Sequence, residues 1–89
     1  MPPARFSVTV EVQLRHGIAD PQGATIERAL PALGVSGVSG VRAGKSFRFD
    51  VDADNREEAL SRARLLADRL LANPVIEESS VTVQGGGPG

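Results

Sequence analysis

Residues 6–14 read FSVTVEVQL, and this stretch decides the fold. Apolar side chains occupy every second position: Phe6, Val8, Val10, Val12 and Leu14. Polar side chains lie between them: Ser7, Thr9, Glu11 and Gln13. A period of two kept over five apolar positions predicts a strand with one buried face and one polar face. The buried face needs a second layer of structure to cover it.

The first segment that can supply this layer spans residues 21–33. Four apolar side chains follow the helical spacing i, i+3, i+4 and i+7: Ile26, Ala29, Leu30 and Leu33. Asp20 is expected to cap this helix, with Pro21 at its first position. Gly34 suits the left-handed residue beyond the end, and Pro31 is expected to tighten or kink the last turn.

A second and clearer helix follows Asp54 or Asn55. Either residue can cap it, with a glutamate three residues later completing a capping box. Its apolar stripe consists of Ala59, Leu60, Ala63, Leu66, Ala67 and Leu70. Asn73 and Pro74 are expected to end this helix.

Residues 35–52 carry apolar side chains in a single phase across Gly44: Val41, Ala43, Phe47, Phe49 and Val51. The phase allows one long strand bent at Gly44, or two strands that turn at Ala43 and Gly44. Ala-Gly is a poor two-residue hairpin turn, so we favour the long bent strand. Residues 75–83, VIEESSVTV, predict a last short strand.

The element order is therefore β-α-β(β)-α-β. It predicts an α+β, two-layer sandwich with a mostly antiparallel sheet and two helices on one face, related to the ferredoxin-like arrangement. Residues 4–84 are expected to form a single domain and residues 85–89 a flexible glycine-rich tail. An 89-residue chain is marginal alone, and its long middle strand can pair with a second copy. We therefore expect a dimer that exchanges a strand and a helix.

Composition excludes several classes of protein. The net charge is −1 with both signs interspersed, and aromatic residues make up 3% of the chain, which argues against a nucleic-acid partner. The chain has no cysteine, so disulfides, thiolate metal sites and cysteine nucleophiles are excluded. The sequence shows no secretory leader and no apolar run of membrane-spanning length, so we expect a cytoplasmic protein without a membrane partner.

Signatures of catalysis or cofactor binding are missing from the sequence. The lone histidine, His16, lies in a loop without a recognisable catalytic partner. Residues 37–45, GVSGVRAGK, resemble a phosphate loop but precede a strand, so no helix N-terminus is offered to a phosphate. We therefore predict no catalytic, cofactor or metal residue. The polar face of the sheet is either exposed to solvent or buried at a polar subunit interface.

The predicted functional residues are instead contacts with a partner or a second copy: Asp20, Pro21, Gly23, Arg42, Gly44, Lys45, Asn73 and Pro74. Two interpretations of the DPQG stretch, residues 20–23, remain open. It is either a plain helix cap or a docking corner, where Gly23 lets the backbone of a partner come close.

Three stretches occur together and in order: GIADPQG (17–23), VRAGK (41–45) and LLANPVIE (70–77). With residues 6–83 as a whole, they resemble the small, separately encoded subunit of phosphoribosylformylglycinamidine synthase. That family converts formylglycinamide ribonucleotide to formylglycinamidine ribonucleotide in purine biosynthesis, using ATP and ammonia from glutamine. The resemblance implies a non-catalytic subunit without a cofactor, which bridges a glutaminase subunit and a large synthetase subunit. It also implies a homodimer that exchanges the first helix and the middle strand, with a tetramer as the alternative oligomeric state.

A second hypothesis belongs to another class. Many ferredoxin-like dimers are regulatory modules that bind a small molecule. Such a module would need a ligand pocket at the dimer seam near Arg42, Lys45 or Arg48.

Overall fold

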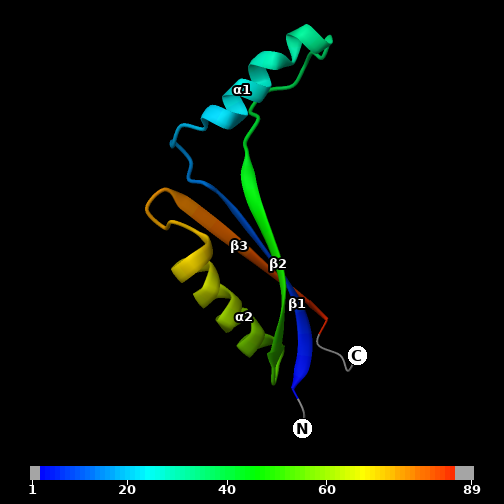
Figure 1. The fold of residues 1–89 in the computed structure, drawn as a ribbon, viewed down its shortest axis with the longest axis vertical. Helices are drawn as coiled ribbons and strands as arrows, with labels where there is room; N and C mark the ends of the chain where they lie inside the picture. The colour runs from blue at the N-terminus through cyan, green and yellow to red at the C-terminus, as the bar shows by residue number, and fades with distance from the viewer. Residues whose placement is uncertain (1–2, 86–89) are drawn as a thin grey trace.

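The computed structural model describes residues 3–85. In chain order the elements are β1 (Ala4–Leu14), α1 (Pro21–Ala29), the 3-10 turn η1 (Pro31–Leu33), β2 (Gly44–Ala53), α2 (Arg56–Leu66), the π-helical turn η2 (Ala67–Leu71) and β3 (Glu77–Gly85). The strands form an antiparallel sheet in the order β2-β1-β3 (Figure 1). The predicted α+β class and antiparallel sheet are confirmed. β3 includes Gly85, the first residue of the predicted tail; the rest of that tail lies outside the described residues.

The core lies between β1 and α2. The inward side chains of β1 are almost fully buried: Phe6, Val8, Val10 and Val12. They pack in one cluster with small residues of α2 and its π-helical extension: Ala59, Ala63 and Ala67. An alanine at every fourth position forms a small-residue stripe on one face of the helix, which lets the helix approach the sheet closely. Each buried valine contributes roughly 1.5–3 kcal/mol. The alternation in residues 6–14 therefore predicts the buried face correctly.

The ends of α2 follow local chemistry. Of the two predicted caps, Asn55 is the one used, and its side-chain oxygen accepts a hydrogen bond from the Glu58 backbone N–H at 2.8 Å. The Glu58 carboxylate in turn accepts from the Asp54 N–H at 3.3 Å. Beyond the π-helical turn the backbone becomes extended at Ala72, just before Asn73 and Pro74. The predicted end of the helix is thus confirmed.

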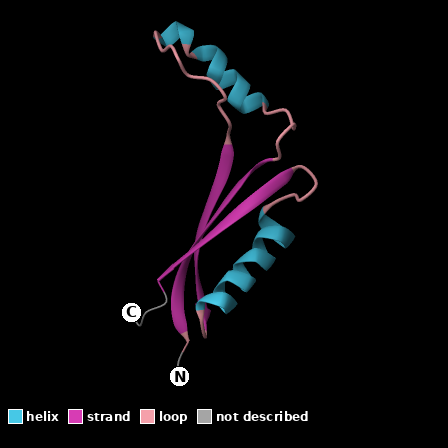
Figure 2. Cartoon of the chain, turned by 180° about the vertical axis from the view of Figure 1, so that it is seen from behind, coloured by secondary structure: helices cyan, strands magenta, loops and turns pink. Residues whose placement is uncertain are grey.

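The first helix does not lie on the face of the sheet, where the predicted two-layer arrangement places both helices. Within residues 3–85 only α2 covers the sheet, whereas α1 projects beyond the end of the strands (Figures 1 and 2). The Cα radius of gyration is 17.2 Å, against about 12 Å for a compact chain of this length. The molecule measures 57 × 29 × 15 Å. The apolar stripe of α1 therefore finds no sheet of its own chain to cover.

The middle strand is shorter than predicted. β2 begins at Gly44, and residues 34–43 form neither the long bent strand nor the alternative hairpin. Gly34, Gly37 and Gly40 have φ angles of 74°, 80° and 70°, which interrupt an extended backbone three times. Gly44 is required for a different reason: a Cβ atom there would lie 2.8 Å from the Val12 carbonyl oxygen of the neighbouring strand.

Candidate protein-interaction surfaces

Residues 15–43 form an arm that joins β1 to β2 and carries α1 and η1 (Figure 2). Gly23 is the only buried residue of this arm. Large apolar side chains are exposed along it: Ile26, Leu33, Val35 and Val38. Leu33 is 74% exposed, although it belongs to the predicted apolar stripe of the helix. The arm thus presents an apolar face that its own chain leaves uncovered.

A groove between β2 and α2 is the second unpartnered surface. It has a volume of about 700 Å³ and is lined by apolar side chains with charged ones beside them: Phe49, Val51, Leu65 and Leu66, then Asp50, Asp52, Arg62 and Arg69. β2 is an edge strand, because only β1 pairs with it. Its outer backbone groups are therefore available to a further partner.

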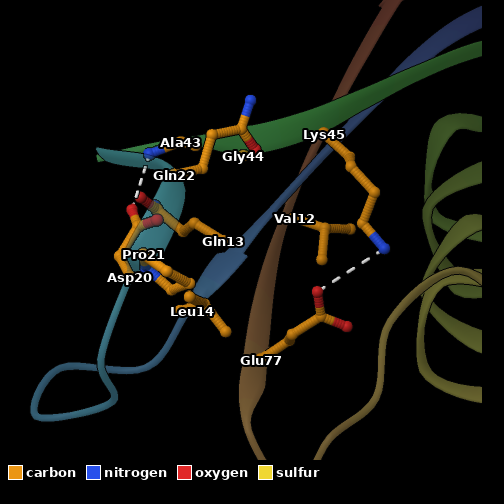
Figure 3. Close-up of a pocket in the computed structure, with 10 residues that line it drawn as sticks. All are labelled: Val12, Gln13, Leu14, Asp20, Pro21, Gln22, Ala43, Gly44, Lys45 and Glu77. Carbon is orange, nitrogen blue, oxygen red and sulfur yellow. Dashed lines mark hydrogen bonds and ion pairs between the residues drawn. The ribbon is translucent and has the colours of Figure 1, made fainter. Parts of the chain in front are cut away.

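The DPQG corner lies where the arm meets the sheet. One oxygen of the Asp20 carboxylate accepts from the Gly23 N–H at 2.9 Å, which is the predicted helix cap. The other oxygen accepts from the Ala43 N–H at 2.7 Å, just before β2 begins (Figure 3). Asp20 therefore links the first turn of α1 to the chain that enters β2.

Gly23 has a role within the chain. A Cβ atom at this position would overlap the carbonyl oxygen of Val41, which lies against the first turn of α1. The close backbone approach that the sequence suggests for a partner is thus made by Val41 of the same chain. Of the two interpretations of the DPQG stretch, the cap is confirmed, and the docking corner stays a prediction.

Several predicted contact residues surround one shallow cleft of about 270 Å³ (Figure 3). Asp20, Pro21, Gly44 and Lys45 line it together with Glu77 of β3 and other residues. The Lys45 ammonium pairs with the Glu77 carboxylate at 3.5 Å. These residues are therefore close in space although they are distant in sequence.

The remaining predicted residues lie nearby or at a separate turn. Arg42 donates from one guanidinium nitrogen to the carbonyl oxygens of Leu14 and Arg15, at 3.1 and 3.5 Å. Asn73 and Pro74 lie in the exposed turn between η2 and β3, where the Arg15 guanidinium donates to the Pro74 carbonyl oxygen at 3.0 Å. Arg42 and Lys45 thus each make a contact within the chain, and both also line a hollow of about 250 Å³ beside β2, so a ligand role for them stays a prediction.

The sequence analysis missed three residues that shape these surfaces. Glu27 and Glu77 accept bonds from segments distant in sequence, and no local spacing marks such contacts. Leu65 lies off the predicted stripe of α2 but lines the groove. A leucine outside the predicted apolar stripe, among charged residues of the helix, was the available signal.

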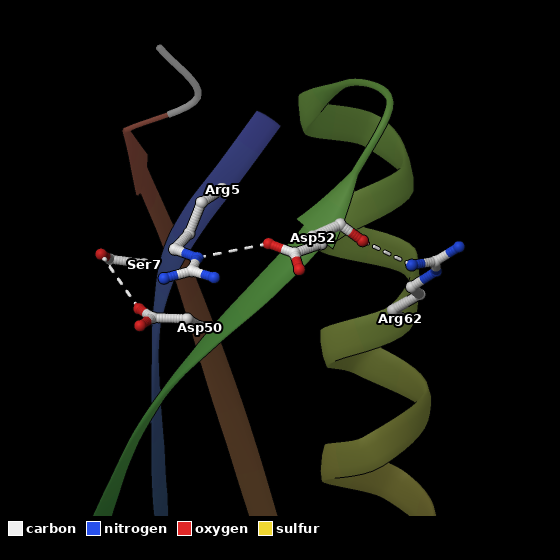
Figure 4. A network of polar contacts seen from close by, with 5 residues as sticks. All are labelled: Arg5, Ser7, Asp50, Asp52 and Arg62. Atoms are coloured by element: carbon white, nitrogen blue, oxygen red, sulfur yellow. Dashed lines mark hydrogen bonds and ion pairs between the residues drawn. The ribbon is translucent and has the colours of Figure 1, made fainter. Parts of the chain in front are cut away.

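The open face of the sheet carries a polar network (Figure 4). Arg5 pairs with Asp52 at 3.3 Å, and the Ser7 hydroxyl donates to the Asp50 carboxylate at 3.4 Å. The Arg62 guanidinium donates to the Asp52 carbonyl oxygen at 2.6 Å, which ties α2 to β2. The contacts of Arg5 and Ser7 join β1 to β2 within one chain, and that of Arg62 joins α2 to β2. Exposure to solvent and burial at a polar interface remain alternatives for this face.

Two further findings concern the described part of the chain. Within residues 3–85, His, Asp and Glu side chains form no group of three or more that could hold a metal ion. In the same range, every helix is too short or too polar to cross a bilayer.

The charge state of Asp20 predicts a pH dependence. The hydrogen bonds from Gly23 and then Ala43, with a smaller contribution from the Arg42 charge, hold its pKa below the ordinary value of 3.8. Because the folded-state pKa is lowered, the carboxylate stabilises the fold fully above pH 3.8, and this contribution disappears as the pH falls through the lower folded value. We expect the difference in free energy of unfolding between wild type and Asp20→Asn to shrink as the pH falls from about 6 to about 2.

Denaturant titrations of both proteins at several pH values measure this difference. The remaining acidic groups are common to both proteins, so their contributions to the difference cancel. A difference that is constant across the range, or that grows toward acid, would contradict the assignment.

The uncovered arm, the unfilled groove and the cleft at the DPQG corner are the candidate interaction surfaces of this small α+β fold. The model of the family described as PurS, phosphoribosylformylglycinamidine (FGAM) synthase, matches residues 7–85. The match spans nearly the whole chain, so the chain belongs to this family.

Relatives and solved structures agree with this assignment. The phosphoribosylformylglycinamidine synthase subunit PurS of Mycobacterium leprae is 44% identical over 73 residues, which are 82% of this chain and 89% of the relative. That of Archaeoglobus fulgidus is 42% identical over 72 residues, 81% and 90% of the two chains. The crystal structure of the Thermotoga maritima purS subunit has a TM-score of 0.84 at 38% identity and covers 94% of this chain and 95% of its own.

A further neighbour is part of a larger assembly. A chain in the structure of PurLQS from Thermotoga maritima has a TM-score of 0.83 and 38% identity, and the match covers 90% of this chain and 98% of that one. The predicted family resemblance is confirmed, and the chain is similar to a subunit of FGAM synthase throughout its folded part.

Proposed function

We propose that this chain is the assembly subunit of FGAM synthase, and that it acts as a homodimer in which the arm of each copy occupies the groove of the other. One observation carries the proposal: the arm exposes its apolar face beyond the sheet, while the groove beside α2 in the same chain is unfilled. Two copies related by a two-fold axis can satisfy both surfaces at once.

The energetics favour this pairing. A chain of 89 residues is only marginally stable alone, and here a third of the chain lies in an arm without a core of its own. Burial of the exposed side chains of that arm would contribute roughly 1.5–3 kcal/mol for each large apolar residue. The charged groups at the edge of the groove, such as Arg62 and Asp52, can remain at the rim of the interface.

The proposed role of the dimer is to join two larger subunits. The neighbour from Thermotoga maritima is one chain in a structure of PurLQS. We infer that this chain likewise joins a glutaminase and an ATP-dependent synthetase in the cytoplasm, as the family resemblance implies. Holding the two active sites in a fixed arrangement favours transfer of ammonia over its loss to solvent, which is a proximity effect.

Reconstitution tests this proposal directly. We expect the chain, the glutaminase and the synthetase to elute together from a sizing column as one species that contains all three. Without this chain, the two larger subunits should elute separately. Equal association of the two larger subunits in its presence and absence would contradict the proposed role.

A further inference from the structure

The arm has a defined direction although none of the strands packs extensively against it. Its two ends leave the sheet side by side, because Gln13 of β1 pairs with Gly44 of β2. The contacts of α1 lie within the arm itself, with η1 and with residues 41–43. The direction of the arm must therefore be set by the short polar joint at its base.

Two carboxylates hold this joint from the side of the helix. Asp20 accepts from the N–H groups of Gly23 and Ala43, as described above. About two turns further along α1, an oxygen of Glu27 accepts from the Val41 N–H at 2.9 Å. The two backbone donors before β2, at positions 41 and 43, are thus each bound to a carboxylate of the α1 segment.

The same short segment is held on its other sides. The carbonyl of Val41 lies against Gly23, where a side chain would not fit. Between the two bound N–H groups, the Arg42 side chain donates to the carbonyl oxygens at the end of β1. Residues 41–43 are therefore held on two sides, by α1 through Asp20 and Glu27 and by the end of β1 through Arg42.

We propose that Asp20 and Glu27 are positioning residues, which hold the arm at the angle required to reach the groove of a second copy. This inference rests on the homodimer proposed above. An arm fixed in its bound direction loses less conformational freedom on association, so the joint strengthens the dimer without touching the partner. Hydrogen bonds to charged acceptors are stronger than those to neutral ones, so these two carboxylates can hold the direction of the arm firmly.

Paired substitutions separate positioning from helix stability. Glu27→Ala removes the acceptor for Val41, whereas Glu27→Gln retains a side-chain carbonyl oxygen that can accept the same bond. Asp20→Ser keeps a good helix cap for Gly23 but lacks the second oxygen for Ala43. Asn55→Ser changes the cap of α2 in the same manner, far from the joint, and serves as the control.

Two measurements on the full chain then decide. We expect Glu27→Ala to accelerate hydrogen exchange at the Val41 amide and Asp20→Ser at the Ala43 amide. Each variant should raise the dimer dissociation constant about 10-fold, because a released arm must be ordered on association. Exchange within α1 and β1 should stay unchanged. Asn55→Ser should match the wild type in both measurements, and Glu27→Gln should lie between the wild type and Glu27→Ala, because it keeps the acceptor but loses the charge.

Unchanged exchange at Val41 in Glu27→Ala would overturn the joint itself. Faster exchange with an unchanged dissociation constant would overturn its positioning role. If Asp20→Ser fails to fold, as a loss of β1 protection would reveal, the Glu27 pair decides, because neither of its members touches the cap. A monomeric wild type would instead overturn the proposed dimer, and exchange would still show whether the joint exists.

Discussion

Leu33→Asp should abolish the dimer while leaving the fold of each copy intact. Leu33 is 74% exposed within one chain, so a charge there meets solvent in the monomer and should change its stability by less than about 0.5 kcal/mol. In the proposed dimer the same side chain lies in the groove of the partner. An unpaired charge buried there costs about 3–5 kcal/mol, which raises the dissociation constant at least 100-fold.

Sedimentation equilibrium of the variant measures this change, and a matched variant controls for charge. Ser36→Asp places the same charge in the same arm, at an exposed polar position, and should leave the dissociation constant within a few-fold of the wild type. Ile26→Asp, on the same stripe of α1, should behave as Leu33→Asp does. Equal effects of the charges at positions 33 and 36 would contradict the placement of the arm in the groove.

Omission of this chain from the reconstituted enzyme should reduce turnover with glutamine on the order of 100-fold, as expected when two tethered activities are separated. Turnover with free ammonia should be unchanged, because the proposed role of the chain is to align the source of ammonia and not to form the C–N bond. The two rates are measured side by side with the synthetase and glutaminase held constant.

Variants sharpen the same comparison. Enzyme assembled with Leu33→Asp should behave like enzyme without the chain, whereas Ser36→Asp should restore full glutamine-dependent turnover. Loss of both rates in parallel would indicate a direct part in the synthetase reaction and refute the bridging role. Turnover of glutamine or ATP by the chain alone would refute it as well.

Local chemistry explains why much of the fold is predictable from the sequence. The period-two pattern of residues 6–14 fixes which side of β1 is buried, because successive side chains of a strand point to opposite faces. The caps at Asp20 and Asn55 are equally local, since each binds an N–H three residues further on. Pro31 tightens the end of the first helix into the 3-10 turn η1, as expected.

The place of the arm is not predictable in the same way. An apolar stripe such as that of α1 states that a helix face prefers burial, but it does not state against which chain. The single phase of residues 35–52 likewise hides the three left-handed glycines, whose backbone angles interrupt the strand. The Glu27 contact to Val41 spans 14 residues and leaves no periodic trace in the sequence.

The residues of the cleft and the groove are predicted only in part, because contacts between segments distant in sequence leave no local pattern. The structure gathers Asp20, Pro21, Gly44 and Lys45 at one cleft, yet Asn73 and Pro74 lie at a different turn. The groove depends on residues that the helical and strand patterns assign to other roles. Phe49 has the same phase as the core side chains of β2, but it is only half-buried, because it lies at the edge of the core and lines the groove beside α2.

The mass of the wild-type chain in dilute solution tests the central claim most directly. Sedimentation equilibrium over a range of low concentrations should give at least twice the chain mass of 9.3 kDa, because an arm and a groove that fit each other remain uncovered in a single copy. A folded species that stays at 9.3 kDa at every concentration would contradict the account.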